Sequence, residues 1–241
     1  MKNDFFHDLY MTIRDVRVRD CSAMSLSHLL HGYLSVYAMV RVSPALEREY
    51  GTLQEIHGRL REIAKELSKT MKDTSIELDE RIGYVADLMD AYQTYSDMDL
   101  LNEALDVAYR ILTVDEKGEI VIPGRTPNVC RLLCSWYYFT GEEWCLEMAE
   151  EVISLHINNE DRLDWIRAVN NLRDFVDKCV FISMNENERL KDELFHMKKN
   201  REERCEGIDN KTYYFEVLAI QEYEFFILCE RKDLLERYTI I

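Results

Sequence analysis

Glycine and proline are scarce in this sequence. Its 241 residues include only 8 Gly and 3 Pro, well below the usual share of either residue. An all-β fold joins many short strands by tight turns that depend on both residues, so the shortage disfavours such a fold. Long helices need neither residue in their interior. The composition therefore predicts an all-α protein.

Positively charged residues are outnumbered by negatively charged ones. Thirty Lys and Arg stand against 46 Asp and Glu, which gives a formal net charge of −16. Such a charge repels a phosphate backbone, so we expect no nucleic-acid partner. The sequence has no uncharged run of about 18 residues, so no membrane-spanning helix is expected.

Cysteine pairs with the spacing of redox or zinc motifs are missing. None of the seven cysteines forms a CxxC motif, and most stand among apolar residues, which is typical of reduced thiols in a core. The first 15 residues, MKNDFFHDLYMTIRD, lack the apolar stretch of a signal peptide. These observations predict a cytoplasmic location.

Apolar residues recur with helical spacing along most of the chain. We expect helices over 5–19 and 24–41, followed by one long helix that begins at Pro44, with Ser43 as its N-cap. The long helix follows from residues spaced alternately four and three apart: Leu46, Tyr50, Leu53, His57, Leu60, Ala64, Leu67 and Met71. Gly51 and Gly58 lie within it, seven residues apart, and predict the close approach of a second helix.

Residues 76–114 and 127–156 each predict two helices joined by a short connection, which is typical of an antiparallel hairpin. Between them lies the longest irregular segment, 115–128. The predicted fold is all-α, with stacked antiparallel helical hairpins and an N-terminal long-helix bundle. We expect an N-terminal bundle over 1–114 and a C-terminal hairpin region over 115–241, or one continuous domain. The helix over 212–229 is apolar almost all round, so it is either central or a contact between copies of the chain.

Known catalytic and metal-binding motifs are absent. The sequence contains no P-loop, GxGxxG, HExxH or GxSxG. His28 and His31, Asp87 and Asp90, and the pair Glu193 and His196 have spacings that metal ligands can have. We interpret Asp87 and Asp90 as the solvated face of an amphipathic helix, and we predict no catalytic residue, no metal and no cofactor.

Aromatic residues cluster around the turn at 140–142. Trp136, Tyr137 and Trp144 surround Glu142, and Arg125 precedes the first of the two helices. These five residues are the candidate ligand-binding site, because aromatic rings can stack on ligands beside a carboxylate and a guanidinium. The alternative is that the rings pack between helices, which is commoner for aromatic residues at helical spacing.

The segment 124–156 resembles one hairpin of the α/α-toroid enzymes, the six-hairpin glycosidases and sugar epimerases. The similarity rests on an Arg-led helix, a Thr-Gly-Glu turn, and an aromatic residue followed by Ala. It implies stacking of Trp136 and Tyr137 on a sugar, with Glu142 or Glu143 as an acid. A complete toroid of twelve helices exceeds the length of this chain, so the alternative function is a small carbohydrate-active or carbohydrate-binding protein.

The preceding hairpin resembles tetratricopeptide-like (TPR-like) repeats. Tyr95, Leu101, Ala104 and Ala108 follow the aromatic-then-small spacing of that family, although its characteristic Gly and final Pro are missing. The resemblance implies a concave surface suited to peptides. The function predicted from the sequence is a non-catalytic helical-repeat module that binds a protein or peptide partner. A homo-oligomer held by the helix over 212–229 is a further expectation.

Overall fold

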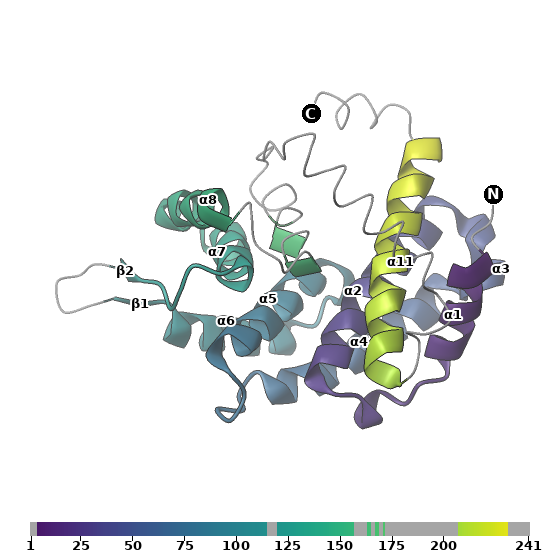
Figure 1. The fold of residues 1–241 in the computed structure, drawn as a ribbon, viewed down its shortest axis with the longest axis horizontal. Coiled ribbons are helices and arrows are strands. Elements are labelled where there is room, and N and C mark those ends of the chain that lie inside the picture. Colours follow the sequence, from purple (N-terminus) through teal and green to yellow (C-terminus); the bar gives the residue numbers. More distant parts are fainter. Residues whose placement is uncertain are drawn as a thin grey trace. The chain divides into compact units, whose positions relative to one another are not determined.

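The fold is all-α, as the composition predicts (Figure 1). The computed structural model describes residues 4–114, 120–156, 163–164, 167–168, 171 and 207–230. Within these residues, the longer helices are α1 (Asp4–Arg14), α2 (Ala23–Val42), α4 (Leu53–Thr70), α5 (Leu78–Tyr95), α6 (Met98–Ile111), α7 (Pro127–Thr140), α8 (Glu143–His156) and α11 (Ile208–Glu230). The short elements are η1 (Val18–Asp20), η2 (Pro44–Leu46) and α3 (Glu47–Tyr50). Two short strands, β1 (Thr113–Val114) and β2 (Ile120–Val121), pair in antiparallel orientation.

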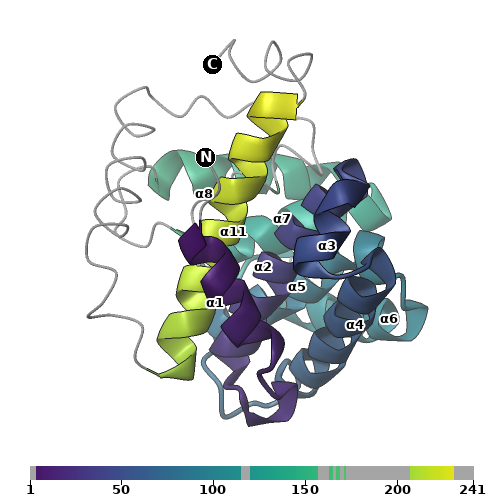
Figure 2. The same ribbon diagram turned by 90° about the vertical axis from the view of Figure 1, so that its right-hand side faces the viewer.

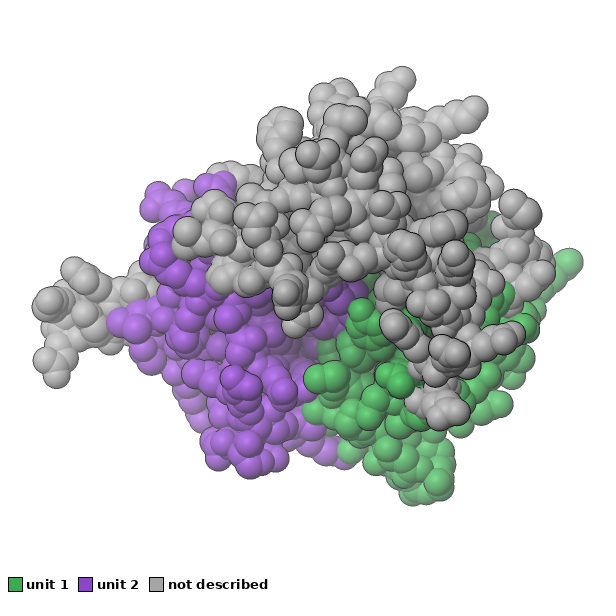
Figure 3. Space-filling model, in the orientation of Figure 1, with its two compact units in different colours: residues 1–66, 183–241 green, residues 67–182 purple. Residues whose placement is uncertain are grey.

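The chain divides into two compact units. Unit 1 combines residues 1–66 with residues 183–241, and unit 2 comprises residues 67–182 (Figure 3). The irregular segment 115–128, which the sequence analysis suggests as a domain boundary, belongs entirely to unit 2.

Unit 1 is held together by the packing of α11 against α2 and α1, elements at opposite ends of the sequence (Figures 1 and 2). Phe215 of α11 is fully buried, and its ring centroid lies 5.3 Å from that of Tyr33 and 6.0 Å from that of Tyr10. Gly32 makes this approach possible, because a Cβ at that position would stand 2.4 Å from the Phe215 ring. The helix predicted over 212–229 thus buries Phe215 inside unit 1, while the side chains of 224–229 lie outside the described residues.

The single long helix predicted from Pro44 is wrong. Gly51 ends α3 with φ +92°, a conformation that L side chains rarely adopt, and α4 begins two residues later. The predicted close approach at Gly58 is also wrong, since no atom of the described residues lies within 4 Å of a Cβ built there. The heptad spacing continues through the break, and its members nearest to the break, Leu46, Tyr50, Leu53 and His57, are all half-buried.

Unit 2 is built from α5, α6, α7 and α8. The packed pairs are α5 with α6, α5 with α7, and α7 with α8. Asp97 caps α6 and Thr126 caps α7, whose first residue is Pro127. These residue types are typical of helix starts. Gly141 ends α7 in the left-handed conformation, with φ +73°. The regular stacking of these helices as repeated hairpins stays a prediction.

Among the helices that the structure describes, none combines the length and the apolar composition needed to cross a bilayer.

Candidate functional site

The five residues predicted to bind a ligand fall into separate environments. Arg125 forms an ion pair with Glu151, with Nη1 2.6 Å from Oε1, and both side chains are about half exposed. Trp144 donates its indole N–H to Glu142 Oε2 at 2.6 Å. Of the expected set, the structure therefore brings together Glu142 and Trp144.

Trp136 and Tyr137 occupy the last turns of α7. Trp136 exposes only 8% of its surface, and its ring centroid lies 6.4 Å from that of Tyr109 on α6. Tyr137 is partly exposed. The burial of Trp136 leaves little of its ring face for stacking on a ligand, which favours the packing alternative for this residue.

A different aromatic group is exposed at the same end of α7. It comprises Tyr138 and Phe139 of α7, Tyr92 of α5 and Met98 of α6, and we call it the aromatic–methionine cluster. Tyr138 and Phe139 have ring centroids 5.1 Å apart, Phe139 and Tyr92 have centroids 5.9 Å apart, and the Tyr92 hydroxyl donates to Met98 Sδ at 2.6 Å. Met98 is 53% exposed and Tyr138 is 47% exposed. Tyr92 and Met98 are not among the five residues predicted from the sequence to bind a ligand, although the helical register of α5 and the start of α6 could have indicated them.

Unit 2 also contains a buried ionic network between α5 and α7. The Arg131 guanidinium is fully buried and donates through Nη2 to Asp87 Oδ1 at 2.5 Å and to Asp90 Oδ2 at 3.0 Å. Ser135 Oγ donates to Asp90 Oδ1 at 2.5 Å, and Asn171 Nδ2 donates to both carboxylate oxygens of Asp90. This network links the two helices through charges shielded from solvent.

The interpretation of Asp87 and Asp90 as a solvated face is wrong. Their side chains are 0% and 7% exposed. The reason is Arg131, whose positive charge compensates both carboxylates within the core. Burial is the largest single effect on the pKa of Arg131 and lowers it, but Asp87 and Asp90 together outweigh burial, so the pKa is raised. A charged residue inside the apolar stretch NVCRLLCS was the sequence signal for this partner.

The histidine and glutamate residues that the sequence suggested for metal binding are described by the structure only in part. Among the described residues, no group of three or more His, Cys, Asp and Glu could hold a metal. His28 Nδ1 lies 2.7 Å from Glu216 Oε2 in unit 1, and both side chains are buried. Glu193 and His196 lie outside the described residues.

The cysteines of unit 2 have raised pKa values. Burial raises the pKa of the Cys145 thiol to about 12. The pKa of Cys134 is raised mainly by a hydrogen bond with Cys130, and burial is the second cause.

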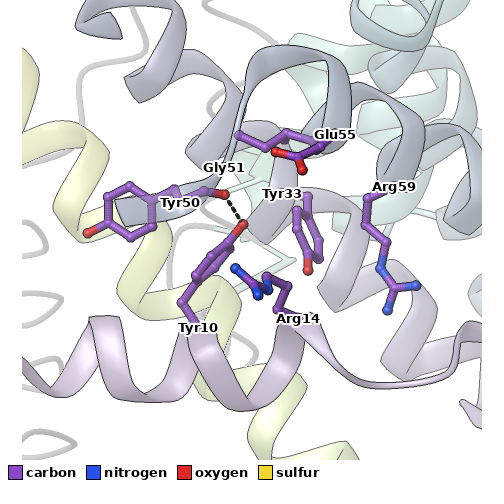
Figure 4. Close-up of a pocket in the computed structure, with 8 residues that line it drawn as sticks. Tyr10, Arg14, Tyr33, Tyr50, Gly51, Glu55 and Arg59 are labelled. Atoms are coloured by element: carbon purple, nitrogen blue, oxygen red, sulfur yellow. Dashed lines mark hydrogen bonds between the residues drawn. The ribbon is translucent and has the colours of Figure 1, made fainter. Parts of the chain in front are cut away.

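A cavity of about 300 Å³ opens among the N-terminal elements of unit 1 (Figure 4). Three tyrosines from three different helices line it: Tyr10 of α1, Tyr33 of α2 and Tyr50 of α3. The Tyr10 hydroxyl donates to the Tyr50 carbonyl oxygen. Burial raises the pKa of all three phenols, that of Tyr50 to about 12, so none of them serves as a base near neutral pH.

Three charged side chains line this cavity, Arg14, Glu55 and Arg59, and the last two are engaged with the protein itself. Arg59 lies over the Tyr33 ring, donates to the Val16 carbonyl oxygen and pairs with Glu62 at 2.8 Å. Glu55 accepts from the backbone N–H and the hydroxyl of Thr52, at 2.7 and 2.9 Å, and the backbone bond is the main cause of its lowered pKa. This is a capping box at the start of α4. The cavity is a junction of α1, α2, α3 and α4 whose polar atoms mainly stabilise that junction.

Comparisons with protein-family models, curated proteins and solved structures give no match for this chain. The function proposed below therefore depends on the described surfaces alone.

Proposed function

We propose that this protein is a non-catalytic interaction module that binds a protein or peptide partner through the aromatic–methionine cluster of unit 2. The observation that supports the proposal is the exposure of a contiguous group of rings together with Met98. Contiguous apolar surface that stays exposed on a folded chain is typical of interaction sites. Aromatic residues and methionine are enriched in protein interfaces.

The chemistry of the cluster favours an apolar anchor in the partner. Phe139 and Tyr92 are partly exposed and lie between the two most exposed members, Met98 and Tyr138. Methionine and tyrosine side chains can contact an aliphatic or aromatic anchor without a fixed geometry. A side chain such as Leu or Phe would therefore cover the cluster.

The charge around the cluster favours a basic partner. Asp99 follows Met98 and is exposed, and Glu142 and Glu143 are exposed at the turn between α7 and α8. Together with the net charge of −16, these carboxylates attract lysine and arginine and accelerate their association. The partner that we propose is a peptide segment with an apolar anchor flanked by Lys or Arg.

A random-sequence peptide library displayed on phage tests the proposal. We expect selection to enrich peptides of that composition, and each of the variants Met98→Ser and Tyr138→Ser to weaken their binding by about tenfold or more, since exposed aromatic anchors dominate such interfaces. Fluorescence anisotropy of a labelled peptide gives the dissociation constant. Met24→Ser is the matched control, because Met24 is also half exposed, at 50%, but lies on α2 in unit 1. Failure to enrich any sequence, or equal binding by the two cluster variants and the wild type, would refute the proposal.

The carbohydrate alternative has less support. It needs an open face of Trp136, which is only 8% exposed, and an Arg125 that is not already paired with Glu151.

A further inference from the structure

A second cavity, of about 350 Å³, lies within unit 2 and is positively charged in an acidic chain. Its cations are Lys72 in the connection between α4 and α5, Arg81 of α5 and Arg110 of α6. No Asp or Glu lines it. We call it the Arg81–Arg110 cavity. None of its residues belongs to the aromatic–methionine cluster, so the inference is independent of the proposed function.

The two arginines are not neutralised by the described part of the chain. Lys72 pairs with Glu103 at 3.1 Å, whereas no described carboxylate forms an ion pair with Arg81 or Arg110. Arg81 Nε is buried and has no hydrogen-bond partner among the described residues. A buried donor without a partner carries an energetic cost that a bound acceptor removes.

Asp73, an acid that interacts electrostatically with Arg81, already accepts two hydrogen bonds. Asp73 Oδ1 accepts from the backbone N–H of Ser75 at 2.9 Å and from its hydroxyl at 2.7 Å. These two hydrogen bonds are the main cause of its lowered pKa, and the charge of Arg81 is a minor one. Asp73 therefore leaves the arginines available to another anion.

The rest of the cavity is apolar. Met71, Val107 and Ile111 line it and are 0%, 8% and 9% exposed, whereas Leu78 stands at its margin and is 44% exposed. A bare inorganic anion would use the guanidinium groups but leave these side chains uncovered. A ligand with both an anionic group and an apolar chain would satisfy both parts of the cavity.

We propose that the Arg81–Arg110 cavity binds a carboxylate carried on a short apolar chain. The guanidinium groups of Arg81 and Arg110 hold the carboxylate, because their planar arrays of N–H donors match its two oxygens. The chain lies against Met71, Val107 and Ile111. The cavity volume is at the lower end of the range of about 300–1,000 Å³ for small-ligand sites, which suits a medium-chain acid or the apolar C-terminal residue of a peptide.

Isothermal titration calorimetry with octanoate tests the proposal on the full-length protein. We expect octanoate to bind, and acetate, octanamide and inorganic phosphate each to bind about tenfold more weakly or not at all, because each lacks either the chain or the charge. Equal affinity for octanoate and octanamide would overturn the role of the arginines. Equal affinity for octanoate and phosphate, or no octanoate binding, would overturn the proposal as a whole.

Two variants locate the site. Arg110→Gln changes an exposed residue and leaves the core intact, and Arg81→Gln removes the partly buried guanidinium. Each is expected to weaken octanoate binding by about tenfold, while Arg41→Gln, which removes an exposed charge from the end of α2, leaves it unchanged. Circular dichroism shows whether Arg81→Gln folds, and Arg110→Gln decides the outcome if it does not. Binding by Arg110→Gln equal to that of the wild type would refute the site.

A peptide arm distinguishes the two sources of such a carboxylate. An acetylated tripeptide ending in leucine is titrated with its C-terminus free and with its C-terminus amidated. Tighter binding of the free peptide than of octanoate assigns the cavity to the C-terminus of a protein, and the reverse order assigns it to a free acid. In either case, if the peptide with a free C-terminus binds, amidation must abolish its binding. Equal binding of the free and amidated peptides would contradict the proposal.

Discussion

At the scale of single residues, the most informative side chain is Arg131. It is fully buried and compensates two carboxylates on another helix, Asp87 and Asp90. Attraction between buried charges offsets the large cost of removing them from water only while all the partners are present. Arg125 provides the opposite case within the same unit, because its ion pair with Glu151 is about half exposed.

This contrast makes a paired prediction. We expect Arg131→Met to lower the free energy of unfolding by about 3–5 kcal/mol, because it leaves two acids uncompensated in the core. Arg125→Met, at the exposed pair, is expected to lower it by less than about 1 kcal/mol. Urea unfolding followed by circular dichroism measures both. A cost of Arg131→Met as small as that of Arg125→Met would mean that the network does not stabilise unit 2.

A second prediction at this scale concerns pH. Asp209 of α11 accepts hydrogen bonds from Ser25 at 2.5 Å and from Ser22 at 2.8 Å, and these bonds lower its pKa in the folded state. A lowered pKa means that the carboxylate stabilises the fold above its unfolded pKa, and that this contribution is lost as the pH falls through the folded pKa. Asp209→Asn is therefore expected to reduce stability at pH 7, with a smaller difference from wild type as the pH falls from about 5 toward 3. Urea unfolding at each pH would contradict this if the difference stayed constant.

At the scale of elements, turns and caps were partly predictable and helix continuity was not. The starts of α6 and α7 follow from Asp97 and from Thr126-Pro127, because these residue types satisfy or spare the first N–H groups of a helix. The break at Gly51 was missed because a heptad pattern reports which side chains face the core, and not whether the backbone between them is continuous. The local signals for that break were Gly51 and the capping-box pair Thr52 and Glu55 at the start of α4.

Substituting two glycines that both have open space around them distinguishes the effect of backbone strain from that of side-chain packing. Within the part of the chain that the structure describes, no atom lies within 4 Å of a Cβ built at Gly141 or at Gly58, but of the two only Gly141 has a positive φ. Gly141→Ala is expected to destabilise by about 1 kcal/mol, because alanine is strained in that conformation. Gly58→Ala, within α4, is expected to stabilise by up to about 1 kcal/mol through helix propensity. Thermal unfolding should show a melting temperature below that of the wild type for Gly141→Ala and above it for Gly58→Ala. Shifts of both melting temperatures in the same direction would contradict the prediction.

At the scale of the whole molecule, the sequence predicted the fold class but not which helices pack together. Scarce glycine and proline were sufficient for an all-α prediction. The pairing of α2 with α11 could not be predicted, because a helix that is apolar almost all round does not indicate which face meets which partner. The candidate site was only partly predictable for the same reason. The sequence located an aromatic segment, whereas only the fold separates buried Trp136 from exposed Tyr138.

The α2–α11 contact allows a test of that pairing. Gly32→Ala would place a Cβ against the buried Phe215 ring, and overpacking of this kind costs about 1–3 kcal/mol. We expect lower stability and faster amide hydrogen exchange in α2 and α11. Reducing the ring in the double variant Gly32→Ala/Phe215→Leu should recover part of the loss relative to the sum of the two single variants. Strict additivity of the two changes would contradict the contact.

The division of unit 1 between the two ends of the sequence bears on how the protein is made. During translation, residues 67–182 leave the ribosome as one uninterrupted stretch, whereas α2 must wait for more than half of the chain to be synthesised before α11 can cover it. Until then the surface around Tyr33 that Phe215 later occupies stays open to water, and exposed apolar surface of this kind invites aggregation. The nascent chain therefore depends on α11 for protection of α1 and α2.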